Sequence, residues 1–212
     1  MDRNGLDRKR VSVLWFPVQL DAGFSAYHQS MALRFTTSYL EDSLTLFRYY
    51  KRLAEAAISQ VTDEQLSEVL DPEMNSIALN VKHMAGNMRS RWTDFLNSDG
   101  EKPDRNRNSE FVEPPVTRAE ILKSWESGWS CVFSALEPLT AQDLERTVLI
   151  RGEAHSVMQA VNRQLAHYAY HCGQIIFLAK HFQHSQWKSP TVPRGHSGGF
   201  NQQVKAGERS QR

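Results

Sequence analysis

The 212-residue sequence has no long apolar run, only two cysteines and almost no net charge. None of its apolar stretches approaches the roughly 18 residues that a membrane-spanning helix needs. Cys131 and Cys172 are too few for a disulfide framework and are typical of a chain in a reducing cytosol. We therefore expect a cytoplasmic protein with no membrane-spanning segment.

The charge balance argues against nucleic acid as a partner. Lys and Arg number 25 and Asp and Glu number 24, which gives a formal charge of +1. A nucleic-acid-binding domain normally has an excess of basic residues on one face. The nucleophile-elbow motif of serine hydrolases is also missing, which disfavours that class of enzyme. A chain of this length has room for one packed domain with short appendages.

The first thirty residues differ in composition from the rest. MDRNGLDRKR is polar and basic, and the short apolar stretch VSVLWFPVQL follows it. Pro17 and Gln19 interrupt this stretch and only a poor cleavage site follows, so it makes a weak signal peptide. The alternative is a native start at Met31, just before the first well-patterned helix. We favour this alternative and expect 1–30 to be a poorly ordered extension of a domain over 31–184.

Helix-start signals predict four long helices in that domain. Capping motifs begin at Ser38, Thr117 and Ser156, and Asn75 or Ser76 caps another helix; apolar residues at helical spacing follow each of them. Thr62 opens a further, short helix in the same way. These signals predict an all-α fold, a four-helix bundle with short extra helices. The long helices should cover about 40–60, 76–96, 118–136 and 157–182.

Three other segments have their own signals. Residues 100–116 contain three prolines and many charges, and we expect a long surface loop, compatible with a crossover between helices. The run 147–150 with the Arg151-Gly152 pair predicts a small hairpin before the last helix. The tail over 185–212 is rich in Gly, Pro and Ser and is expected to be irregular.

Two histidines four residues apart, His167 and His171, lie on the last predicted helix. A helix turns by about 100° per residue, so both imidazoles project from nearly the same side, one turn apart. This composition produces about 0.3 such pairs by chance, so the pair alone does not establish a site. With His83 from a facing helix, the pair could supply three corners of a tetrahedral metal site and leave the fourth open.

Polar residues at helical spacing strengthen this interpretation. On two helices a polar line runs beside an apolar face, and such lines are costly if buried without partners. One shared polar cavity would satisfy both lines, and two solvated helix flanks are the alternative. The lines are Gln164, His167, His171 and Gln174 on the last helix and Asn80, His83, Asn87 and Arg91 on the second.

Two segments resemble the DinB-like superfamily. They are VKHMAGNMRSRWTDFLNSDGEKPDRNRNSEF, with one histidine on the second helix, and RGEAHSVMQAVNRQLAHYAYHCGQI, with the motif HxxxHxGQ on the last. The similarity covers roughly 32–201 and points to a branch of uncharacterised bacterial proteins with a DGEK-type segment after the first histidine. The resemblance implies a four-helix bundle, usually a homodimer, in which His83, His167 and His171 hold a divalent metal.

Candidate catalytic residues surround these histidines, although the sequence does not define a catalytic group. Arg91 could meet an anionic substrate, and His155 could approach the site from the hairpin. Cys172 points about 100° away from His171 and is expected in the core. The catalytic candidates are Asn87, Arg91, His155 and Gln174, with Gln164 and Tyr168 as further substrate-contacting or supporting groups, whereas His181 and His184 are expected to be solvated.

Three neutral imidazoles would leave a divalent ion its full charge and favour an anionic fourth ligand, thiolate or hydroxide. Zinc, nickel and iron(II) all suit imidazole ligands. Characterised DinB-like relatives include transferases and isomerases in which metal activates the thiol of a low-molecular-weight cofactor. The resemblance therefore implies a thiol-dependent transferase acting on a small molecule, with a metal-dependent hydrolase as second choice. A non-catalytic metal- or ligand-binding protein, or a sensor, is the alternative.

Overall fold

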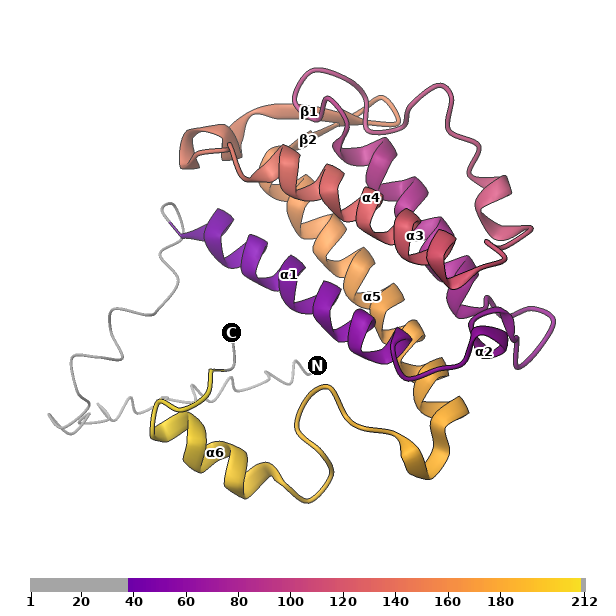
Figure 1. Cartoon of the computed structure of the whole chain (residues 1–212). Coiled ribbons are helices and arrows are strands. Elements are labelled where there is room, and N and C mark those ends of the chain that lie inside the picture. The colour runs from indigo at the N-terminus through magenta and orange to yellow at the C-terminus, as the bar shows by residue number, and fades with distance from the viewer. Residues whose placement is uncertain (1–37, 211–212) are drawn as a thin grey trace, which may run out of the picture. The chain divides into compact units, whose positions relative to one another are not determined.

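Helices dominate the computed structural model, which describes residues 38–210 (Figure 1). The predicted N-terminal extension and the start at Met31 lie outside these residues. The predicted class is confirmed: several packed helices, short extra helices, and a hairpin before the last long helix. The long helices are α1 (Tyr39–Ile58), α3 (Ile77–Trp92), α4 (Arg118–Leu136) and α5 (Val157–Gln183).

Local capping chemistry starts most of these helices where it was predicted. Thr117 and Ser156 form complete capping boxes, and so does Thr62 at the start of the short α2 (Asp63–Ser67). Ser76 rather than Asn75 caps α3, through a bond from the Leu79 amide. The motif at Ser38 is the exception, because α1 begins there without a side-chain cap bond.

Helix α3 ends at Trp92, several residues before the predicted stop near Asn97. Asp94 has φ 47°, a left-handed conformation that a helix cannot continue through. The prediction was wrong here because Phe95 keeps the apolar spacing after the backbone has turned. It is buried and packs on Trp92, with ring centroids 4.7 Å apart.

The long helices close into a ring in which α1 packs on α4 and α5, and α3 packs on the same two helices. Helices α1 and α3 are therefore diagonal across the bundle, and so are α4 and α5. The chain therefore crosses the bundle between α1 and α3 and again between α4 and α5. The long loop over 100–116, for which we considered a crossover, instead joins the neighbours α3 and α4.

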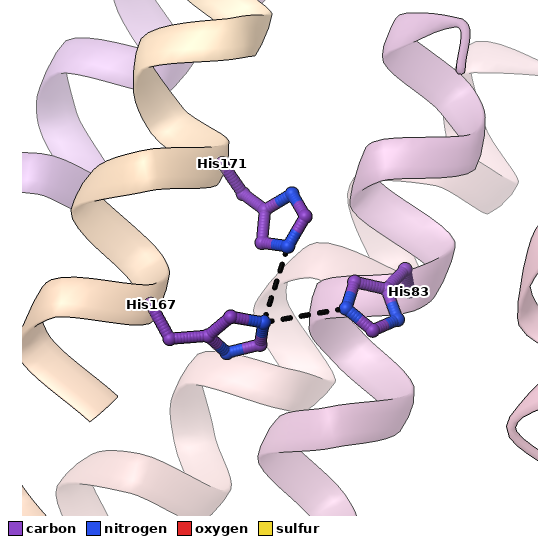
Figure 2. A group of neighbouring side chains, drawn as sticks. All are labelled: His83, His167 and His171. Carbon is purple, nitrogen blue, oxygen red and sulfur yellow. Dashed lines mark hydrogen bonds between the residues drawn. The ribbon is translucent and has the colours of Figure 1, made fainter. Parts of the chain in front are cut away.

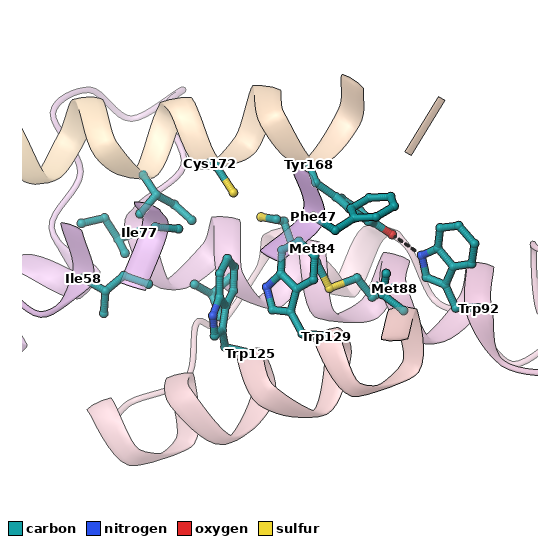
Figure 3. Close-up of a cluster of buried hydrophobic side chains, with 14 of the residues drawn as sticks. Phe47, Ile58, Ile77, Met84, Met88, Trp92, Trp125, Trp129, Tyr168 and Cys172 are labelled. Carbon is teal, nitrogen blue, oxygen red and sulfur yellow. Dashed lines mark hydrogen bonds between the residues drawn. The ribbon is translucent and has the colours of Figure 1, made fainter. Parts of the chain in front are cut away.

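Aromatic side chains from all four helices meet in the core (Figure 3). The Phe47 ring centroid lies 6.1 Å from that of Trp92, 6.2 Å from Trp129 and 5.8 Å from Tyr168. The Trp92 indole donates to the Tyr168 hydroxyl at 2.9 Å, and that hydroxyl donates to Asn87 Oδ1 at 3.1 Å. This buried chain of bonds joins the core to a polar residue of α3.

The predicted hairpin consists of β1 (Thr147–Ile150) and β2 (Glu153–Ser156), paired antiparallel. Arg151 and Gly152 both have positive φ, as a two-residue type I′ turn requires. The Asp99 carboxylate accepts bonds from both of their amides, at 2.8 and 2.6 Å. The hairpin is therefore tied to the loop that follows α3.

The C-terminal tail is not wholly irregular, which corrects the prediction. It contains a 3-10 turn (His184–Gln186) and helix α6 (Ser197–Lys205). The sequence did not predict this helix because two of its nine residues are glycines, and a glycine costs about 1 kcal/mol in a helix interior. None of the helices within residues 38–210 combines the length and apolar character needed to span a membrane.

Candidate metal centre

His83 on α3 and the pair His167 and His171 on α5 point toward one another (Figure 2). The Nε2 atom of His167 lies 3.3 Å from Nε2 of His83 and 3.1 Å from Nε2 of His171. Nitrogens that bind a tetrahedral zinc ion at about 2.05 Å lie about 3.3 Å from each other. The three side chains thus form a group that could hold a metal ion.

The orientation of His83 is set by Glu110. His83 Nδ1 lies 2.8 Å from Glu110 Oε2, and both side chains are buried. Because a carboxylate only accepts hydrogen bonds, Nδ1 carries a proton, and in the neutral ring Nε2 then turns a lone pair toward the other two rings. A carboxylate behind the imidazole is the usual partner of a metal-binding histidine.

Two amide oxygens orient His171 in the same way. Its Nδ1 lies 2.8 Å from Gln174 Oε1 and 3.1 Å from Asn80 Oδ1. Donation from Nδ1 again leaves a lone pair on Nε2. Lone pairs on facing nitrogens repel each other unless a cation or a proton lies between them, so this donor set fits a bound cation.

The electrostatic surroundings keep the α5 pair neutral. Burial, assisted by the neighbouring histidines, lowers the pKa of His167 to about 3. Burial and His83 lower the pKa of His171 to about 4. Both imidazoles are therefore neutral at pH 7, the state in which an imidazole can bind a metal.

Glu110 is the residue of the candidate site that the sequence did not reveal. It lies in a short 3-10 helix (Asn108–Phe111) within the segment that we predicted to be a surface loop. Arg105 donates to both of its carboxylate oxygens, at 2.8 and 2.9 Å. Burial raises the pKa of Glu110, but the bonds from His83 and Arg105 outweigh it and hold the pKa below its usual value.

Gly86 was the signal that could have indicated this contact. It follows His83 by three residues on α3, and a Cβ placed there would lie 2.8 Å from Glu110 Cδ. A glycine in a helix interior beside a candidate ligand indicates that something approaches the backbone closely. The signal does not say which residue approaches.

Of the four catalytic candidates, three lie near the histidine group and His155 does not. Asn87 and Arg91 line a cavity of about 540 Å³ together with His83 and His167. Gln174 lies behind His171, as described above. His155 is not brought to this group: it lies on β2, and its Nδ1 is 3.0 Å from the Glu153 carbonyl oxygen.

The structure places the remaining residues that the sequence analysis singled out close to where it predicts them. Gln164 is buried and lines the cavity. Tyr168 is completely buried and does not line the cavity, but its hydroxyl donates a hydrogen bond to Asn87, which does. Cys172 lies in the core as predicted, and burial raises the pKa of its thiol to about 12. His181 and His184 are exposed at the end of α5.

The fold and the site define a helical protein with a three-histidine group that could bind a divalent metal. The chain belongs to a family of proteins of unknown function, DUF1572, whose profile matches residues 34–196. The matched segment contains all three histidines and Glu110. No curated protein and no solved structure matches the chain.

Proposed function

We propose that this protein is a metal-dependent enzyme in which His83, His167 and His171 hold a divalent ion. One observation carries the proposal: three Nε2 atoms converge, and no fourth Cys, His, Asp or Glu within residues 38–210 joins their group. Three protein ligands with one open position are typical of catalytic rather than structural metal sites.

The reaction class follows from the charge of the ligands. An ion held by three neutral imidazoles keeps both positive charges and acidifies a thiol or a water molecule that binds it. The resemblance to the DinB-like superfamily favours a thiol, supplied by a low-molecular-weight cofactor, and hence a transferase. Hydrolysis of a small molecule is the second candidate, because the same open position would accept water.

The protein's own residues would prepare this site. Glu110 and Gln174 hold two of the imidazoles with Nε2 free, so little reorganisation accompanies metal binding. Asn87 is fixed by Tyr168 and lines the cavity beside two of the histidines. The cavity volume, about 540 Å³, is that of a small-molecule site. We also propose that the protein is a homodimer, as the resemblance implies.

Elemental analysis of the purified protein tests the metal site. We expect one divalent ion per chain in the wild type, with zinc, nickel and iron all compatible with the ligands. The variants His83→Ala, His167→Ala and His171→Ala should each lose it, whereas His181→Ala, which changes an exposed histidine of α5, should keep it. Full metal content in all three site variants would overturn the proposal.

Cobalt substitution tests whether the fourth position is open. A small thiol or azide should displace a water ligand and shift the visible absorption of the cobalt protein. An unchanged spectrum at saturating thiol and azide would contradict catalysis at this site. It would favour the alternative, a non-catalytic metal-binding protein or sensor.

A further inference from the structure

The cavity beside the metal centre is walled by arginines. His83 and His167 line one part of it, and Asn87 and Gln164 lie beside them. The arginines come from α3, the following loop, the hairpin turn and α5, which are far apart in the sequence. They are Arg91, Arg105, Arg107, Arg151 and Arg163.

Acidic partners neutralise only part of this charge. Glu101 Oε2 lies 2.9 Å from Arg91 Nη1, 3.2 Å from Arg105 Nη1 and 3.3 Å from Arg151 Nε. Glu110 pairs with Arg105 and also holds His83. Three arginines therefore share two carboxylates, one of which also serves a candidate metal ligand.

Arg107 and Arg163 have no such partner among the described residues. Within residues 38–210 no carboxylate oxygen lies within 4.0 Å of either guanidinium. Arg107 lies over the Phe111 ring, 5.0 Å from its centroid, and that ring stacks on His83 at 4.5 Å. The wall nearest the metal centre thus keeps an excess of positive charge.

Two buried polar atoms along the same wall lack partners among the described residues. Arg91 and Gln164 are 5% and 3% exposed, and no group within residues 38–210 hydrogen-bonds to Arg91 Nε or to Gln164 Oε1. The Asn87 Oδ1 atom is taken by Tyr168, which leaves the Asn87 amide nitrogen as a donor. Polar atoms without partners in a buried wall are costly. An oxyanion in the cavity would accept a bond from Arg91 Nε, whereas Gln164 Oε1, an acceptor, would need a hydroxyl or another donor group of the same ligand.

We propose that this cavity binds the anionic part of the substrate, a small molecule that carries carboxylate or phosphate groups. Guanidinium groups match the geometry of these oxyanions and bind them with two parallel hydrogen bonds. An arginine cluster with a purely structural role would be matched by carboxylates, and in the part of the chain that the structure describes two of these five arginines are not. The inference rests on the proposed function, because it assigns a substrate class to the same site.

Calorimetric titration of the metal-loaded protein tests the inference. Inorganic phosphate and succinate are titrated separately at constant ionic strength, and the anion that binds identifies the group recognised. Arg107→Gln and Arg163→Gln should each weaken binding by at least about tenfold and leave the metal content unchanged. Both arginines are exposed and form no ion pair with another described residue, so we expect these variants to fold.

The matched control is Arg52→Gln, which changes an exposed arginine of α1 that does not line the cavity. Its anion affinity should equal that of the wild type. If neither anion binds, or if the two cavity variants bind as the wild type does, the inference fails even when one metal per chain is present. If the wild type holds no metal and anion binding still depends on Arg163, the proposed function fails and the anion site remains.

Discussion

Gly86 decides whether Glu110 can reach His83. Alanine would favour the α3 helix by about 1 kcal/mol over glycine, so a glycine at this position is locally unfavourable. The tertiary structure explains why a glycine stands here: the Glu110 carboxylate, held by Arg105, occupies the space that a side chain would fill. A single residue without a side chain thus couples the loop to the candidate metal centre.

Replacing this glycine should weaken metal binding. In Gly86→Ala the new methyl group pushes the Glu110 carboxylate away from His83, and loss of such a partner typically costs 10–100-fold in metal affinity. Competition with a chelator of known affinity measures the effect, and Glu110→Gln should show a loss of the same order. Wild-type affinity in both variants would contradict the role given to Glu110.

The matched control is Gly173→Ala, on the other ligand-bearing helix. Gly173 follows His171 by two residues, and a Cβ there would meet nothing within 4 Å. This variant should keep the wild-type metal affinity. Its free energy of unfolding should rise by up to about 1 kcal/mol, because alanine favours the helix.

At the scale of elements, the contact between α3 and α4 also depends on a glycine. A Cβ on Gly128 of α4 would lie 2.9 Å from Ala85 Cα and 3.0 Å from Met88 Sδ on α3. The two helices approach closely here because Gly128 has no side chain and faces the small Ala85. This contact positions α3, which carries His83 and Asn87 toward the site.

Gly128→Ala should therefore destabilise the protein although alanine favours helices. The overpacked methyl group should lower the free energy of unfolding by about 1–3 kcal/mol, as measured by urea denaturation. Gly173→Ala is again the control, with a change of the opposite sign. A stability equal to or above that of the wild type for Gly128→Ala would show that the helices separate at little cost.

The loop between α3 and α4 behaves as part of the site rather than as a surface connection. Ser90 Oγ donates to the Gly100 carbonyl oxygen at 2.7 Å near its beginning. Lys82 Nζ donates to the Val112 carbonyl oxygen at 2.7 Å near its end. Anchored at both ends to α3, the loop brings Arg105 and Glu110 to the histidines.

For the whole molecule, the buried histidines make the stability of the metal-free protein depend on pH. The pKa of His171 is about 4 in the folded chain, against an ordinary value of 6.5. The unfolded chain therefore binds a proton at a higher pH than the folded chain does. Stability is full above about pH 6.5 and falls as the pH is lowered toward 4.

His171 alone accounts for at most about 3 kcal/mol of this loss, because one pKa unit corresponds to about 1.4 kcal/mol. His167 acts in the same direction, since its pKa is lowered to about 3. Urea denaturation of the metal-free protein between pH 7 and pH 4.5 measures the slope. His171→Gln should reduce the change of the unfolding free energy with pH, and His181→Gln should leave this change as in the wild type. The same pH dependence in both variants would contradict the assignment to His171.

Local chemistry made much of the architecture predictable. Capping boxes at Thr117 and Ser156 and apolar spacing placed the long helices, because both signals act within one or two turns. The same argument put His167 and His171 on one face of α5. It failed at Asp94, where the backbone turns although the apolar spacing continues.

The sequence by itself determined which elements form and which side of α5 the histidine pair faces, because hydrogen bonds and rotations within a helix set both. Only the tertiary structure decided that Glu110 orients His83 across 27 residues and that His155 stays away from the site. It also decided which arginines meet around the cavity. Such contacts depend on the path of a loop, and ion pairs between distant residues leave no periodic pattern in the sequence.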